Sequence, residues 1–160
     1  MTLGHKKRIL IISMILTTLL GMFGCAKAAG KTVTSFETVT LTLRTMRGSY
    51  VYEISNEAGR VEIGRYREVF SGEKTDLIPE QSASCDTQTF IDLMNLCGVI
   101  RWDGFHGKHP KNVLDGTMFN FTASVNNGQK ISADGSANFP KDYHEFVRAL
   151  DEMLAECKTD

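Results

Sequence analysis

The segment 38–43 reads TVTLTL, and its alternation determines the first half of the fold. Valine and leucine at 39, 41 and 43 alternate with threonine, a period of two made of residues that favour strands. The alternation returns at 50–54 and at 61–70, and turn residues at 47–49 and 56–59 separate the three segments. Turns this short predict an antiparallel meander.

The middle of the chain changes character twice. The segment from Ser71 to Ser84 is polar and contains Pro79, so we expect a loop there. Apolar residues then take the spacing of one helix face, at Phe90, Leu93, Met94 and Cys97. Asp86 is the expected N-cap of this helix and Gly98 its end, and a second loop is expected as far as Gly116.

The last third predicts a hairpin and a helix. Apolar residues alternate over 119–125, and Asn126-Asn127-Gly128 suits a type I′ turn. Ile131 and Ala133 then face inward on the next strand. Pro140 is expected to begin the final helix, which carries its apolar residues on one stripe: Tyr143, Phe146, Val147, Leu150, Met153, Leu154 and Cys157.

These elements have the order βββ-α-ββ-α and predict an α+β fold with two layers. We expect about five antiparallel strands, with both helices packed on one face of the sheet. The threonines at 38, 40 and 42, together with Glu53, Arg60 and Glu62, suggest that water covers the opposite face. Residues 36–160 form the single domain of this prediction.

The composition excludes several classes of protein. With 42% apolar residues and 23% charged residues in 160, the chain is neither disordered nor collagen-like. Loss of Lys6, Lys7 and Arg8 would reduce the 18 basic residues to 15, against 19 acidic ones, for a net charge of −4. A mildly acidic surface without a basic cluster argues against binding to nucleic acid.

The N-terminus has the form of an export signal. Basic residues at 6–8 precede Ile9–Gly24, a segment of 16 residues without a charge. A transmembrane helix needs about 20 apolar residues, so a permanent span is the weaker interpretation. We therefore expect a signal peptide over residues 1–24.

The segment Met22-Phe23-Gly24-Cys25 resembles the lipobox of bacterial lipoproteins, with Met22 and Phe23 where that pattern has Leu and a small residue. The resemblance implies cleavage before Cys25, lipid attachment to its sulfur and a tether over residues 25–35. The alternative is cleavage after Ala28 at the A-x-A sequence 26–28, which would give a secreted protein.

Three cysteines remain in the expected domain, and they cannot all pair with one another. Cys85 and Cys97 bracket a helix and should lie about 18 Å apart, beyond disulfide reach. We expect Cys157 to pair with Cys97 or with Cys85, depending on how the helices run; three buried, reduced thiols are the alternative. A nucleophilic Cys85 beside the helix start is a further hypothesis.

The glycine-rich segment 100–110 is the candidate ligand loop. Its candidate residues are Arg101, Trp102, Asp103, Phe105, His106 and His109. Asp103 and the two histidines carry metal-ligating atoms without the spacing of a zinc site, and we expect neither a metal nor a cofactor. The competing interpretation is that Trp102 and Phe105 cover the end of the core while the histidines are solvated.

Segments around Trp102, Val113 and Gly135 resemble small exported proteins of Gram-positive anaerobes, a resemblance that implies export and assigns no activity. The expected function is an extracytoplasmic, lipid-anchored binding or interaction module for an envelope protein or a small ligand. A small surface enzyme that uses a cysteine or the histidine loop, and a structural component of the envelope, are the alternatives.

The lipobox resemblance predicts the effect of Cys25→Ala. This variant should accumulate as an uncleaved precursor, because the cleavage that it implies requires the cysteine. Cell fractionation and intact-mass measurement test this. If the variant's fractionation and processing equal those of the wild type, lipidation is wrong.

Overall fold

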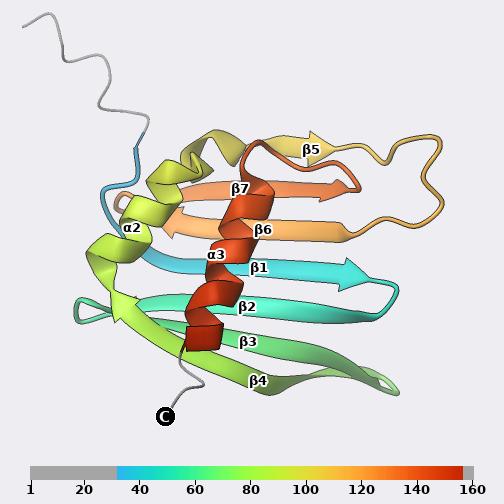
Figure 1. Ribbon diagram of the computed structural model, residues 1–160, viewed down its shortest axis with the longest axis horizontal. Coiled ribbons are helices and arrows are strands. Elements are labelled where there is room, and N and C mark those ends of the chain that lie inside the picture. Colours follow the sequence, from blue (N-terminus) through green and yellow to red (C-terminus); the bar gives the residue numbers. More distant parts are fainter. Residues whose placement is uncertain (1–31, 157–160) are drawn as a thin grey trace, which may run out of the picture. The chain divides into compact units, whose positions relative to one another are not determined.

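The computed structural model describes residues 32–156, which form one sheet with two helices (Figure 1). The strands are β1 (Phe36–Thr45), β2 (Gly48–Glu57), β3 (Arg60–Ser71), β4 (Lys74–Asp86), β5 (Phe105–Gly107), β6 (Met118–Val125) and β7 (Gln129–Ser136). The helices are α2 (Thr87–Leu96) and α3 (Tyr143–Glu156), and a 3₁₀ turn, η2, spans Val99–Trp102. No helix within residues 32–156 has the length and apolarity needed to cross a membrane. The export signal and the lipid-attached Cys25 lie outside the described residues.

The predicted α+β class is confirmed, but the sheet has seven strands rather than five. Their order is β4-β3-β2-β1-β6-β7-β5, and all neighbours are antiparallel except β5 and β7, which run parallel. The sheet is therefore mixed. Figure 1 shows α2 and α3 on the same face of it, as expected.

The expected loop at 71–84 is wrong, because most of it is strand β4. Gly72, with φ of 67°, allows a tight hairpin from β3 into β4. Pro79 is tolerated because β4 is an edge strand, where a missing amide donor breaks no ladder on the outer side. The pairing also skips Glu80, since Arg65 faces Gln81 and Tyr66 faces Pro79, which makes a bulge at this point.

The expected loop up to Gly116 is also partly wrong. It contains η2 and β5, and β5 has only three residues, too few to show a period in the sequence. His106 of β5 lies opposite Asp134 of β7 in the parallel register.

The helix boundaries follow local chemistry. Asp86 caps α2 as predicted, since its Oδ1 accepts a hydrogen bond of 2.9 Å from the amide of Thr89. Gly98 ends this helix with φ of 63°. The helix α3 begins at Tyr143, three residues after the predicted Pro140, because Asp142 has φ of 61° and interrupts the helical backbone.

The core lies between the helices and the sheet. The ring of Phe146 on α3 meets Trp102, Phe121 and Phe90 edge-on, at centroid distances between 5.4 and 6.2 Å. Leu150 and Leu154 continue this stripe and are fully buried. These contacts hold α3 against the centre of the sheet.

Residues 32–35, which we placed in the tether, are attached to the domain. Asn95 of α2 accepts from the amide of Val33 at 2.8 Å and donates to its carbonyl at 2.9 Å. Asn126 likewise bonds the backbone of Thr32 and Thr34. The chain therefore enters the domain at the end of the sheet that holds the β6–β7 turn.

The buried face of α3 can be tested by substitution. Leu150→Ala should lower the free energy of unfolding by about 2–5 kcal/mol, and Leu150→Asp should prevent folding because it buries an unpaired charge. His144→Asp, on the exposed side of the first turn, is the matched control and should be tolerated. Circular dichroism and chemical denaturation measure both; a stable, folded Leu150→Asp protein would refute the assigned face.

Candidate functional site

The aromatic residues of the candidate ligand loop belong to the core. Trp102 is 2% exposed, and its indole N–H donates to the carbonyl of Lys141 at 3.0 Å. Phe105 is half-buried and packs on Phe119 at a centroid distance of 6.3 Å. These two rings therefore cover one end of the core, as the competing interpretation of this segment expected.

The polar residues of the loop fasten it to β7. Asp103 accepts from the amide of Ser132 at 3.1 Å, and Nδ1 of His106 lies 2.5 Å from a carboxylate oxygen of Asp134. His109 bonds the hydroxyl of Ser136 at 2.8 Å and the carbonyl of Val113 at 2.6 Å. Because each side chain has a different partner, the loop does not gather them at one point.

Arg101 lies apart from these residues, with its guanidinium over Gly98 at the end of α2. Within residues 32–156, no group of three histidine, cysteine or acidic side chains is arranged to hold a metal.

The face of the sheet opposite the helices, which we call the open face, is rich in hydroxyl groups. Cross-strand pairs place Thr38, Ser55 and Glu62 in one row and Thr40, Glu53 and Gly64 in the next. These two rows hold eight hydroxyl residues from five strands: Thr38, Thr40, Ser55, Ser82, Ser84, Thr122, Ser124 and Ser132. An antiparallel sheet can expose one face to water, and this face has that polar character.

A hollow of about 430 Å³ lies on the open face over β1 to β4. At the side of this hollow, the ring of Tyr66 lies across Gly64. A Cβ on Gly64 would stand 2.7 Å from the tyrosine ring. Glu53 and Glu62 are the charged residues of the lining, and hydroxyl groups complete it. We call this the Tyr66 hollow.

A second hollow of about 280 Å³ lies on the same face over β1, β6 and β7. Its polar lining comes from Arg44, Asn120, Asp134 and Ser136, and the last two are the partners of His106 and His109. Strand β1 contributes to both hollows, since Thr40 lines the first and Thr42 the second.

The exposed apolar side chains lie mainly near the end of the sheet that holds the β1–β2 and β3–β4 turns, away from the Tyr66 hollow. We call this end the hairpin end. Met46 and Phe70 are 80% and 78% exposed at the β1–β2 and β3–β4 hairpins. Leu114 and Met118 are exposed just before and at the start of β6.

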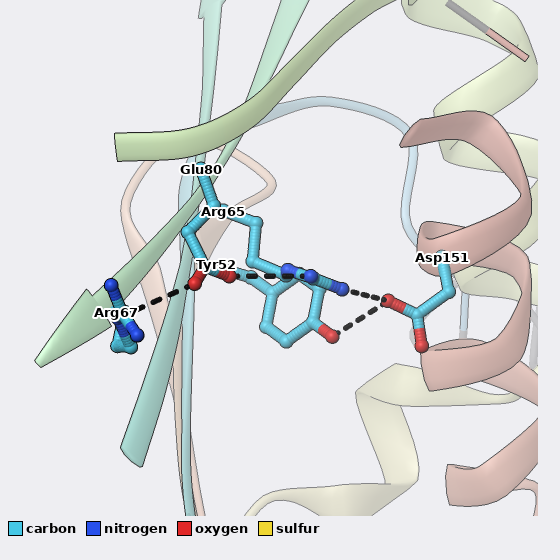
Figure 2. Close-up of polar contacts among 5 residues, drawn as sticks. All are labelled: Tyr52, Arg65, Arg67, Glu80 and Asp151. Carbon is cyan, nitrogen blue, oxygen red and sulfur yellow. Dashed lines mark hydrogen bonds and ion pairs between the residues drawn. The ribbon is translucent and has the colours of Figure 1, made fainter. Parts of the chain in front are cut away.

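A separate polar cluster joins α3 to the sheet (Figure 2). The hydroxyl of Tyr52 donates to Asp151 at 2.8 Å, and Arg65 pairs with Asp151 at 3.3 Å and with Glu80 at 3.2 Å. Glu80 also pairs with Arg67 at 3.5 Å. Two cations face two carboxylates here, so the cluster is balanced and serves to position α3.

The bulge at Glu80 explains how the edge strand joins this cluster. The skipped residue brings its carboxylate within reach of both Arg65 and Arg67. The sequence contained no sign of this partner, because the segment that contains Glu80 was expected to be a loop.

Cys85 and Cys97, the two cysteines among residues 32–156, are free thiols in the structure, which gives no support to the predicted disulfide. Cys97 lines a small hollow with Asp142, at the start of α3 and about 20 Å along the helix from Glu156. Cys157, the predicted partner of Cys97 or Cys85, lies outside the described residues. Burial and the carboxylates of Asp86 and Glu62 raise the pKa of Cys85, which disfavours a nucleophilic thiolate.

Comparisons with family models, with curated proteins and with solved structures found no match to this chain, so the proposals below rest on its geometry.

Two buried tyrosines make stability depend on alkaline pH. Burial raises the pKa of Tyr52, as does its hydrogen bond to Asp151, and burial raises the pKa of Tyr143. Unfolded tyrosines ionise near pH 10, where the folded state still retains these protons. The unfolded state then binds fewer protons, so the free energy of unfolding should fall as the pH rises above about 10.

Single substitutions should separate the two tyrosines. Tyr52→Phe should lower the free energy of unfolding at pH 7 by about 1 kcal/mol because it loses a hydrogen bond. Tyr143→Phe should not lower it, since the buried Tyr143 hydroxyl has no hydrogen-bond partner among residues 32–156. Both variants should lose less stability above pH 10 than the wild type. Denaturation at pH 7 and pH 11 measures this; equal pH dependence in all three proteins would contradict the assignment.

Proposed function

We propose that the protein is an extracytoplasmic, lipid-anchored binding module and that its ligand lies on the open face of the sheet. The basic segment, the uncharged run and Cys25 support the anchor. The observation that carries the binding proposal is the Tyr66 hollow, which lies on a sheet face that no helix of residues 32–156 covers.

The composition of the open face favours a polar ligand. Its central rows carry hydroxyl and carboxylate groups, which form directional hydrogen bonds, and no exposed large aliphatic side chain. A large, permanent protein interface is usually more apolar than this.

The path of the chain into the domain is compatible with an accessible open face. The side-chain hydrogen bonds of Asn95 and Asn126 to the backbone hold residues 32–35 at one end of the strands, where β1 begins. Both helices of residues 32–156 lie on the other face of the sheet, so neither blocks the hollow on the open face.

The enzyme hypotheses have less support. A cysteine nucleophile is disfavoured by the raised pKa of Cys85. Both ring nitrogens of His109 have hydrogen-bond partners, Ser136 and Val113. This histidine therefore holds the loop in place.

Cysteine labelling in intact native cells tests the proposal. Single cysteines are placed on the open face by Thr40→Cys and Thr122→Cys, and on the outer faces of the helices by Asp92→Cys and Glu152→Cys, in a background with Cys85→Ser and Cys157→Ser. A membrane-impermeant maleimide should label the helix positions equally fast in cells and in purified protein. It should label the open-face positions several-fold more slowly in cells.

Two results would contradict the proposal separately. If no position is labelled until the cells are lysed, the domain does not face the outside. For each position the labelling rate in cells is divided by the rate in purified protein. If this ratio is the same for open-face and helix positions, the open face is not occupied in the cell. A Met46→Cys variant reports on the hairpin end; protection there alone would move the binding surface to the exposed apolar residues.

A further inference from the structure

We propose that the Tyr66 hollow binds a neutral glycan chain, an inference that rests on the proposed binding function. The hollow combines the two features that sugar recognition requires, a flat aromatic ring and a set of hydrogen-bonding side chains around it. The ligand class follows from how these groups are arranged.

The ring of Tyr66 lies against the sheet. Three of its atoms stand within 3.0 Å of the position that a Cβ of Gly64 would occupy, so the ring can lie this low only because residue 64 is glycine. The residue is half-buried and lines the hollow. A ring held in this way offers apolar surface to the C–H face of a sugar at low cost in side-chain entropy.

Carboxylates and hydroxyls flank the ring. Glu53 lies opposite Gly64 on the neighbouring strand, and Glu62 lies one row away on β3. Glu62 pairs with Arg60 at 3.1 Å, whereas Glu53 has no hydrogen-bond or ion-pair partner within residues 32–156. A free carboxylate accepts hydrogen bonds from adjacent hydroxyls of a sugar, and Ser55 and Ser82 can both donate and accept.

The charge of the hollow selects between classes of sugar. Glu53 and Glu62 are its charged lining residues and, within residues 32–156, only Glu62 has a cationic partner, Arg60, so the hollow keeps a net negative charge that disfavours uronic acids or sulfated sugars. The ligand is therefore a neutral glycan.

The size and position of the hollows indicate a chain rather than one sugar. The Tyr66 hollow has about 430 Å³, and the second hollow, of about 280 Å³, begins two residues along the same strand, at Thr42 beside Thr40. Binding should therefore become tighter from a monosaccharide to a tetrasaccharide.

Titration calorimetry with defined oligosaccharides tests the inference. The probes are oligomers of glucose, of mannose and of N-acetylglucosamine, from monosaccharide to hexasaccharide, with oligogalacturonate of matched length as the anionic control. We expect at least one neutral series to bind and oligogalacturonate not to bind. Tyr66→Ala and Glu53→Gln should each weaken the neutral oligomer by about tenfold, and Tyr66→Phe should retain binding.

Matched variants control for general effects on the sheet. Phe70→Ala removes an exposed aromatic ring from the same strand and face, outside the hollow, and Glu57→Gln neutralises an exposed carboxylate on the same strand as Glu53. Both should bind like the wild type. Glu53→Gln keeps the shape of the side chain, so it tests the site even if Tyr66→Ala fails to fold.

Each remaining outcome overturns a defined part of the account. Glycan binding that Tyr66→Ala and Glu53→Gln leave unchanged would refute this site. Absence of binding to every neutral probe, together with open-face protection in cells, would refute the glycan and leave the binding module standing. Absence of both would refute the two proposals together.

Discussion

The packing of one phenylalanine ring supports the whole architecture. Phe146 of α3 lies where Trp102, Phe121 and Phe90 meet, so it joins a helix, a strand, the 3₁₀ turn and the second helix in a single aromatic cluster. Burial of such rings is the largest source of stability in a domain of this size. Removing this ring would leave a cavity where both helices meet the sheet, and such a loss typically lowers the free energy of unfolding by about 3–5 kcal/mol.

Packing both helices on one side has a direct consequence for function. Within residues 32–156 the two helices cover one face of the seven-stranded sheet and no helix covers the other, so the second face consists of side chains that water tolerates. In this chain those side chains are mostly serine, threonine and glutamate, with Tyr66 lying across Gly64. The stability of the domain resides in one layer and the proposed ligand site in the other, so substitutions at Glu53 can change binding without disturbing the core.

Sequence patterns predicted the elements that bury one face, and they missed the elements whose placement does not depend on a buried face. The strand around 38–43 and the stripe of α3 were predicted because one face is buried and the other is not. Strand β4 was missed because it is an edge strand exposed over most of its length, so its sequence carries no alternation, and β5 is too short to show one. The open-face threonines and Glu53 were predicted to be wetted, but Ser82 and the place of Tyr66 depend on the pairing of β3 with β4. Trp102 was a candidate for ligand binding on composition alone, whereas its burial depends on tertiary contacts.

The central claim is that a ligand occupies the open face while the helix layer serves stability. The most direct measurement is an NMR titration of ¹⁵N-labelled protein with the neutral oligosaccharide series. The account predicts that chemical shifts change at Thr40, Glu53, Gly64 and Tyr66 and stay constant along α2 and α3. Shift changes confined to the helices, or to the hairpin end around Met46 and Phe70, would contradict it.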